Sequence, residues 1–325
     1  MVIAQFLGNG FEGDQVMKML KEKVGKGGME LTVRTESPLR TCTSVVASTT
    51  TTELIEASGD ISSDELKELL TRLDKIKGSA RSLCVMGSMP PGCPDSTYAD
   101  IYQRSANPKT LCLIDSVAGL KPLLETISRE DKRGPAMLKV NAAELCALAS
   151  IKKSNDEVGG VKEDELVAAI QEFCAKFRQK DSQALTAIAI TDGSHVAHLA
   201  VLKEVSFELF QVPVSVLPSD VTLFPIGAGD AVAAGTLAAW QSLTEGTENG
   251  AACLPDNIKA SLEAFDKKVD VSDDPTTSIM LSAFNFGLAC GSASCLQEQN
   301  SVVETSDVLR LFQQGTPTFL SAHSF

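Results

Sequence analysis

From residue 82 onward, short apolar runs alternate along the chain with amphipathic stretches of helical period. Short apolar runs are typical of buried strands, and the 3.6-residue period is typical of helices packed on a sheet. Because the two patterns alternate, we expect an α/β fold with a mostly parallel sheet covered by helices on both faces, a three-layer αβα arrangement. The pattern predicts strands at residues 82–88, 111–115, 136–140 and 184–191, and helices at 95–105, 120–127, after 141, and at 164–180.

The first sixty residues have a different pattern. A glycine-rich turn at residues 7–14 leads into an amphipathic helix. Two runs rich in β-branched residues follow, at 31–36 and 42–57, and the second run is polar at alternate positions. These runs predict a small, partly solvated antiparallel sheet, a β lid over residues 29–58, with Arg40 between its strands.

The last third of the chain is more irregular. Residues 196–212 predict a β-hairpin or meander. Residues 244–278 are acidic and rich in turn formers, which predicts a solvated surface insertion with one helical stretch at 258–267. A helix at 279–296 carries small residues on one side, which would admit either a flat ligand or a neighbouring helix; we favour helix packing. A last helix is predicted at 305–314.

One glycine-rich turn lies between a β-prone run at 221–224 and an Ala-rich stretch of high helix propensity. Gly227 and Gly229 have no Cβ, so the backbone can approach a ligand closely, and the first amides of the helix point at one place. Asp230 could cap the helix or accept a proton. A tight turn with an aspartate N-cap is the alternative, and these residues alone do not decide between the two.

Several other polar loops are expected beside this turn. In a parallel sheet covered by helices, ligands bind at the carboxyl ends of the strands. The loops at residues 87–88, 141, 191–193 and 227–230 all follow predicted strands. We therefore expect them to meet at one edge of the sheet, which favours a functional role for Asp230.

Composition excludes some partners. The 325-residue chain has a net charge of −13, so the phosphate backbone of a nucleic acid is not an expected ligand. It has neither an apolar stretch of membrane-spanning length nor a basic segment before its first apolar residues, so we expect no membrane contact and no secretory signal. The nine cysteines are scattered without a C-x-x-C pair, which indicates reduced thiols and predicts a cytoplasmic protein.

Taken together, these motifs resemble those of the ribokinase-like (PfkB) carbohydrate kinases, over residues 4–314 apart from the acidic insertion. The resemblance implies one ribokinase-like domain with a Rossmann-like sheet and a β lid. The G-A-G-D sequence at the turn is similar to the C-terminal signature of the family. By this resemblance Asp230 is the general base on the sugar hydroxyl, and the amides of Gly227, Ala228 and Gly229 form an anion hole.

Two further stretches resemble the family's nucleotide-binding motifs. Residues 139–144 (K-V-N-A-A-E) are similar to K-P-N-x-x-E, with valine in place of proline, and residues 191–193 (T-D-G) are similar to a turn that contacts the nucleotide. A second glycine of that turn is Val196 here. The residues that the resemblance places at ATP are Lys139, Asn141, Glu144, Thr191 and Gly193. Of these, Asn141 and Glu144 would also organise Mg²⁺ and the phosphates through water.

Two stretches indicate the branch of the family that acts on phosphorylated sugars. Residues 87–92 (G-S-M-P-P-G) are similar to the G-S-L-P-P-G of 1-phosphofructokinases and tagatose-6-phosphate kinases. Residues 40–43 (R-T-C-T) are similar to the R-x-N/C segment of their lid. A guanidinium and a hydroxyl suit a sugar phosphate, so the resemblance implies that Arg40 and Ser88 hold it. A solvated lid charge is the alternative for Arg40.

The chain departs from the family at its front. Members begin with a strand that carries a sugar-binding aspartate and with a G-G-x-x-x-N helix start, whereas residues 4–13 already resemble the next element.

These observations leave three hypotheses for the function. An ATP-dependent kinase of a sugar or sugar phosphate, of the hexose-phosphate kinase type, is one hypothesis. A nucleotide-binding pseudokinase or regulatory protein without turnover is another, and a nucleoside or unphosphorylated-sugar kinase is a third. Exposed lid strands predict a homodimer.

Overall fold

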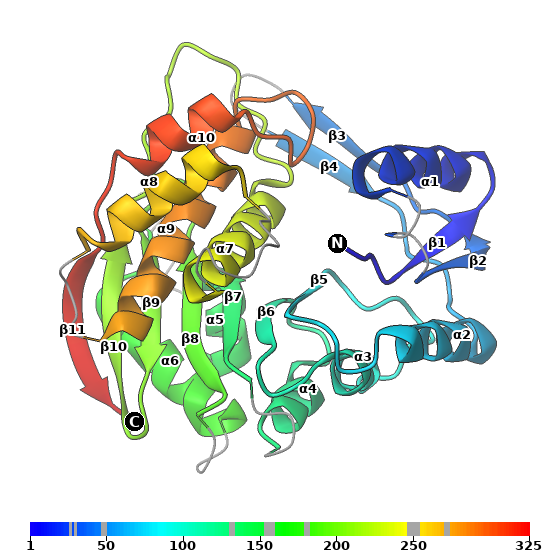
Figure 1. Cartoon of the computed structure of the whole chain (residues 1–325), viewed down its shortest axis with the longest axis horizontal. Coiled ribbons are helices and arrows are strands. Elements are labelled where there is room, and N and C mark those ends of the chain that lie inside the picture. Colours follow the sequence, from blue (N-terminus) through cyan, green and yellow to red (C-terminus); the bar gives the residue numbers. More distant parts are fainter. Residues whose placement is uncertain are drawn as a thin grey trace. The chain divides into compact units, whose positions relative to one another are not determined.

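The structure is a computed structural model of the chain (Figure 1). It describes residues 1–25, 28, 31–46, 51–129, 134–152, 160–178, 183–245, 254–269 and 274–325. The contacts divide the chain into two compact units, and each is described by itself. Unit 1 comprises Met1–Ala80, Gly87–Asn107 and Ala118–Thr126, and unit 2 comprises Arg81–Met86, Pro108–Val117 and Ile127–Phe325.

Unit 2 is built on a sheet of seven described strands in the order β11-β10-β9-β8-β7-β6-β5. Strands β5 to β8 pair in parallel, and β9, β10 and β11 each pair antiparallel with the strand before. Because β10 again runs with β5 to β8, most of the strands share one direction, and the predicted mostly parallel sheet is confirmed. The bounds are β5 (Ser82–Met86), β6 (Leu111–Asp115), β7 (Ala136–Asn141), β8 (Leu185–Thr191), β9 (Ala197–Leu202), β10 (Ser206–Val212) and β11 (Thr318–Ser324).

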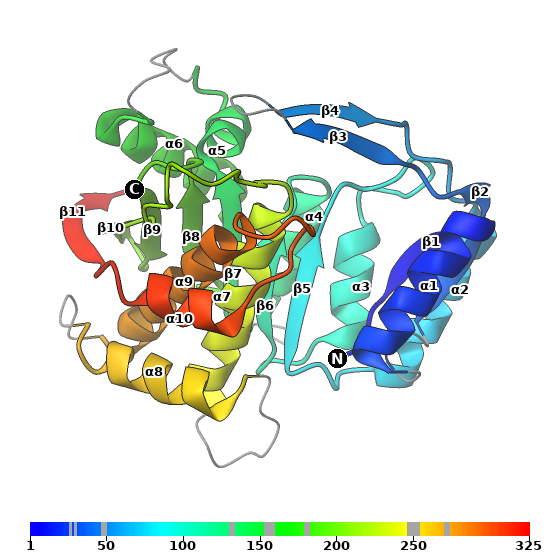
Figure 2. The same cartoon turned by 90° about the horizontal axis from the view of Figure 1, so that it is seen from above.

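Helices cover both faces of this sheet, as Figure 2 shows. On one face lie α5 (Ala142–Ala149) and α6 (Glu163–Phe177), and on the other lie α7 (Ala228–Glu245), α8 (Asp256–Asp266), α9 (Pro275–Ser294) and α10 (Thr305–Phe312). Because both faces are covered, the central strands are nearly continuous runs of buried residues: β6, β7 and β9 have almost no exposed position. The predicted αβα arrangement is confirmed.

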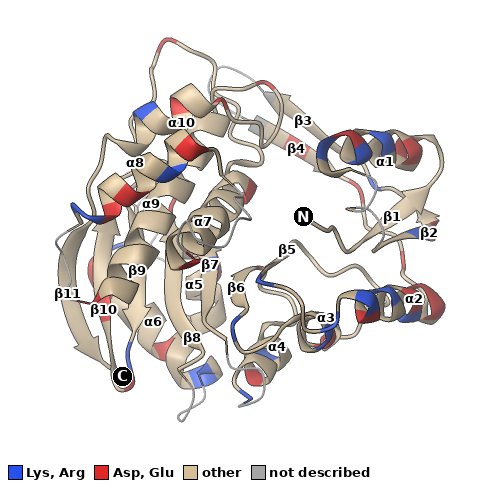
Figure 3. Ribbon diagram, in the orientation of Figure 1, with Lys and Arg blue, Asp and Glu red and all other residues tan. Residues whose placement is uncertain are grey.

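Helices α7 and α9 pack closely through small residues. Gly287 lies against the backbone of α7 at Val232 and Thr236, and Gly291 lies against the side chain of Val232. Helix α9 is buried along almost its whole length and carries no charged residue, so it is plain tan in Figure 3. The small residues thus serve helix packing, which was the favoured prediction for this stretch.

Unit 1 contains two small sheets. Strand β1 (Gln5–Asn9) pairs in parallel with β2 (Thr32–Pro38), and β3 (Cys42–Val46) forms an antiparallel hairpin with β4 (Thr51–Ile55). The helices are α1 (Phe11–Val24), α2 (Ser63–Leu73), a 3-10 turn η2 (Asp74–Ile76), α3 (Thr97–Ser105) and α4 (Leu120–Ile127), whose last residue belongs to unit 2.

The predicted single antiparallel lid at 29–58 is therefore wrong in part. The first of its two runs carries Leu31 and Val33, which are fully buried against Leu69 and Leu73 of α2, so that run belongs to the core of unit 1. Only the second run forms a solvated hairpin, in which the side chain of Leu54 is 62% exposed.

Two other predictions need correction, and one strand was missed. Residues 221–224 form no strand, because the backbone is held elsewhere: the Phe224 amide donates to the Cys295 carbonyl at 2.8 Å. Helix α8 is not a solvated insertion, since it buries Ile258 and Leu262 in the core of unit 2. Other parts of that stretch, at 246–253 and 270–273, lie outside the described residues. Strand β11 was not predicted at all.

Candidate functional site

The carboxyl ends of β6, β7 and β8 lie beside one another in unit 2, because these strands pair in parallel. The last residue of β7, Asn141, pairs in register with Thr191, the last residue of β8. Ile114 pairs with Leu138, so Asp115 and Lys139 occupy the next register position and share one face of the sheet. Two of the predicted nucleotide loops therefore do meet at this edge.

Lys139 and Asp115 form an ion pair at this edge. The ammonium Nζ lies 3.1 Å from each carboxylate oxygen, and the side chains are only 8% and 16% exposed. Burial raises the pKa of the Asp115 carboxyl and the charges of Asp230 and Glu144 add to that, while Lys139 opposes it. The four charged groups therefore lie close enough to influence one another.

The start of α7 lies beside this pair. A Cβ on Gly229 would stand 3.1 Å from the Lys139 ammonium, so the first turn of the helix and the lysine head group are in contact. Asp230, in the same turn, is exposed and has no ion-pair partner among the described residues. Its carboxylate is thus available to a ligand.

The turn before α7 has a backbone that only glycine adopts easily. Gly227 has a φ of +80°, and a Cβ there would clash with Ser301, whose hydroxyl donates to the Gly227 carbonyl at 3.1 Å. The Ala228 amide donates to the Pro225 carbonyl at 3.1 Å, so it is already engaged. The amides of Gly227 and Gly229 have no acceptor among the described residues.

Asn141 and Glu144 form a capping box at the start of α5. The Asn141 Oδ1 accepts the Glu144 amide at 2.8 Å, and the Glu144 Oε2 accepts the Asn141 amide at 2.9 Å. The second carboxylate oxygen, Oε1, has no partner among the described residues. In the part of the chain that the structure describes, no three His, Cys, Asp or Glu side chains gather into a metal cluster.

The turn after β8 is held by one hydrogen bond of its own and by one from Val161, in the segment before α6. The Asp192 carboxylate accepts the Val161 amide at 2.8 Å, and its carbonyl accepts the His195 amide at 3.0 Å. Gly193 has a φ of +61°, and a Cβ at this position would meet no described atom within 4 Å, so its surface is open. The exposed Val196 is the last residue of this loop before β9.

The predicted sugar-phosphate residues belong to unit 1. Arg40 donates to the Ser58 hydroxyl at 2.9 Å, and Ser88 is exposed after Gly87, whose carbonyl accepts the Tyr98 hydroxyl at 3.1 Å. The structure does not test a role for either residue, so their part in a site stays a prediction.

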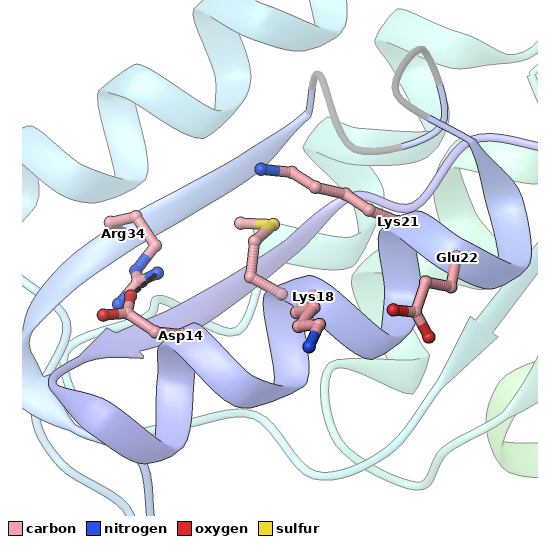
Figure 4. A pocket seen from close by; sticks show the side chains of 6 residues that line it. Asp14, Lys18, Lys21, Glu22 and Arg34 are labelled. Atoms are coloured by element: carbon pink, nitrogen blue, oxygen red, sulfur yellow. Dashed lines mark hydrogen bonds and ion pairs between the residues drawn. The ribbon is translucent and has the colours of Figure 1, made fainter.

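A shallow pocket of unit 1 contains none of the predicted residues (Figure 4). It lies on α1 and β2, where Arg34 pairs with Asp14 at 2.9 Å, and it is also lined by Met17, Lys18 and Lys21. Lys21 lies in the last turn of α1, where a cation complements the helix dipole.

Asp115 and Cys84 were missed by the sequence analysis. The rule that selected Asn141 also selects Asp115, since it ends a buried parallel strand. Cys84, on β5, gives no such signal; burial raises the pKa of its thiol to about 12, with contributions from Asp115 and Asp230.

Comparison with solved structures shows a similar fold. In structure the chain is similar to phosphofructokinase-2 from Escherichia coli in complex with fructose-6-phosphate, at 17% identity and a TM-score of 0.59, over 94% of this chain and 79% of that one. It is also similar to a protein described as a possible 1-phosphofructokinase from Thermotoga maritima, at 16% identity and a TM-score of 0.58, over 98% and 83%. Ribokinase from Giardia lamblia matches at 15% identity and a TM-score of 0.62, over 94% and 80%.

No helix among the described residues is both long and apolar enough to cross a membrane. The model of the pfkB family carbohydrate kinases matches residues 2–254, which is most of the chain. The fold, with helices on both faces of a mostly parallel sheet, is that of the similar structures. The chain therefore belongs to the pfkB family of carbohydrate kinases.

Proposed function

We propose that this carbohydrate kinase transfers the terminal phosphoryl group of ATP to a hydroxyl of a sugar phosphate, with Asp230 as the general base. The observation that carries the proposal is the exposed Asp230 carboxylate without an ion-pair partner among the described residues, in a helix turn that touches the ammonium of Lys139. The carboxylate would accept the hydroxyl proton as the oxygen attacks phosphorus, and ADP would leave.

The anion hole would be smaller than the sequence suggests. The Gly227 and Gly229 amides are open donors at the positive end of the α7 dipole, and they can bind the negative charge of the transferred group. The Ala228 amide can join them only if it leaves the Pro225 carbonyl. Lys139 adds a full positive charge beside the same turn.

The nucleotide would lie over the ends of β7 and β8, with its phosphates toward Asn141, Glu144, Thr191 and Gly193. The donor chemistry fits Mg²⁺, which prefers oxygen ligands and keeps several waters when bound with phosphates. The free Oε1 of Glu144 and the second lone pair of Asn141 Oδ1 would accept hydrogen bonds from those waters, and the ion would neutralise phosphate charge.

The sugar phosphate would be held by Arg40 and Ser88, as the motif similarity suggests. The alternative acceptor, a nucleoside or an unphosphorylated sugar, would not need the Arg40 guanidinium. An Arg40→Gln variant separates the two: it should raise KM for sugar phosphates and leave KM for unphosphorylated acceptors unchanged.

The quaternary state is part of the proposal. The β3–β4 hairpin exposes Val45, Leu54 and Ile55, and two strands alone make a marginal sheet. Pairing with the hairpin of a second copy would bury these side chains. The proposal therefore includes a homodimer through the hairpin, and Leu54→Lys should shift the protein to monomer in sedimentation velocity. Scattered free thiols support the cytoplasm as its location.

The test of the base is Asp230→Asn, with Asp220→Asn as the matched control in the preceding exposed segment. Loss of a general base should lower kcat about 10²- to 10⁴-fold. ATP binding, measured by calorimetry, should survive, and the control should behave as wild type. ADP release is followed against a panel of sugar phosphates. Turnover of Asp230→Asn at the wild-type rate would refute the assigned base.

The competing proposal is a nucleotide-binding regulatory protein without turnover. It would be favoured if the wild-type chain bound ATP but no sugar phosphate stimulated ADP release. In that case the substrate panel, and not the Asp230 variant, decides the matter.

A further inference from the structure

Resting on the proposed function, we propose that Asp115 is a positioning residue that holds the ammonium of Lys139 at the first turn of α7 and away from Asp230. The two side chains come from neighbouring strands, β6 and β7, and point to the same face of the sheet. That face is the one covered by α7.

The geometry of the pair fixes the lysine head group. Nζ lies 3.1 Å from Oδ1 and 3.1 Å from Oδ2, so it stands on the axis of the carboxylate. An ammonium has three N–H donors, and two of them face Asp115. The third remains for an oxygen of a ligand. Lysine has a flexible four-carbon stem, so without Asp115 this direction would not be fixed.

Gly229 provides the space for the ammonium. A Cβ at this position would stand 3.1 Å from Nζ, closer than ordinary van der Waals contact. A methyl group there would require the lysine head group to shift by a few tenths of an ångström. The glycine of the G-A-G-D turn therefore has a second role beside its open amide: it lets Lys139 reach the helix end where phosphate charge would be bound.

Removal of Asp115 would leave Lys139 near another carboxylate. Asp230 lies in the same helix turn as Gly229, and no ion pair joins it to Lys139 in the structure. Without Asp115 the ammonium would be attracted to Asp230, and an ion pair between them would occupy the base. Asp115 thus keeps the base and the cation apart, so that both face the ligand.

A purely structural role would look different. Buried ion pairs add little to stability on average, because desolvation of the two charges offsets their attraction. Breaking such a pair lowers stability wherever it lies in the fold. Only the positioning role predicts a change in ATP binding and turnover by a residue that does not itself touch ATP.

The experiment compares Asp115→Asn, Lys139→Met and the double variant for the dissociation constant of ATP, kcat and thermal stability. Loss of one charged hydrogen bond should weaken ATP binding about 10- to 100-fold in Lys139→Met. Asp115→Asn should weaken it to a similar extent and also lower kcat, and the double variant should bind ATP no worse than Lys139→Met. Asp115→Glu, which keeps the charge, should recover part of the loss.

The matched control is Glu245→Gln, which breaks the ion pair of Arg81 with Glu245 at the other end of α7. It should change thermal stability only. Wild-type ATP binding and kcat in Asp115→Asn would overturn the inference, and so would additive losses in the double variant. If no sugar phosphate is turned over, the proposed function fails, yet the comparison of ATP dissociation constants still decides the role of Asp115.

Discussion

The contact between α7 and α9 can be tested by adding one methyl group, with Gly287→Ala. A Cβ on Gly287 would lie 2.6 Å from the Val232 carbonyl oxygen, 3.0 Å from the Thr236 amide, and closer still to the Thr236 hydroxyl. Ordinary contact begins at 3.4 Å, and two of these three groups are backbone that no rotamer change can move. The two helices would have to separate, and overpacking of this kind costs about 1–3 kcal/mol.

Helix propensity acts in the opposite direction, because alanine favours a helix over glycine by about 1 kcal/mol. Since the clash is with backbone, we expect the upper part of the overpacking range and a net loss of about 1–2 kcal/mol. At about 2–4 °C per kcal/mol for a unit of this size, Tm should fall by about 2–8 °C. Calorimetry measures the shift.

The matched control is Ala234→Gly, at an exposed position of α7, which reports the propensity term alone. It should lower stability by about 0.5–1 kcal/mol. If Gly287→Ala instead raised Tm, helix propensity would outweigh packing, and the close approach of the two helices would be refuted.

Two further predictions concern charge and thiol chemistry. Hydrogen bonds from the backbone amides of Ser62 and, to a smaller extent, Glu36 lower the pKa of the Glu65 carboxyl. The ionised carboxylate therefore stabilises the folded state at pH values above its pKa in the unfolded state, and this stabilisation is lost as pH falls through its pKa in the folded state. Glu65→Gln should therefore flatten the stability curve of unit 1 in acid, measured by denaturant unfolding from about pH 3 to 7; an unchanged slope would contradict this. Among the described cysteines, exposed Cys42 should be alkylated first in the native protein, while Cys84, whose pKa burial raises to about 12, should react only after unfolding. Peptide mass mapping reads the order, and early labelling of Cys84 would contradict it.

Elements were predictable where local pattern and tertiary environment agree. The strand at 111–115 in unit 2 and the helix at 120–127, almost all of it in unit 1, have the predicted bounds, because an apolar run suits a buried strand and an amphipathic stretch suits a helix with one buried face. Strand β11 was missed since it is an edge strand: its run of mixed small and polar residues is half-exposed, and it pairs only with β10 among the described strands.

The lid was misjudged for a related reason. A two-residue period predicts that a run forms a strand, but it does not predict which other strand pairs with it. The run at 31–36 was joined to its nearest β-prone neighbour, whereas burial of Val33 against α2 places it beside β1, earlier in the chain. The segment at 221–224 has a high β propensity but forms no strand, because it pairs with no described strand. Its tertiary environment outweighs its local propensity.

Much of the candidate site followed from one rule, that loops at the carboxyl ends of parallel strands meet. It brought Asn141 and Thr191 to one edge, as the register shows. The rule could not show that Asp115 would engage Lys139, because an ion pair between neighbouring strands depends on register and on which face each side chain takes. Nor could it show that the Ala228 amide turns back to the Pro225 carbonyl.

The arrangement at this edge has a physical logic in its balance of charge. A lone carboxylate in the first turn of a helix is stabilised by the helix dipole, and so is an incoming phosphate, so the two compete for the same field. A neighbouring cation resolves the competition only if it is held where it would attract a phosphate without pairing with the proposed base. A buried second carboxylate on the adjacent strand can hold it there, and the pair of Lys139 with Asp115 has that geometry. The parallel half of the sheet makes it feasible, because only parallel neighbours present two strand ends side by side at the start of a helix.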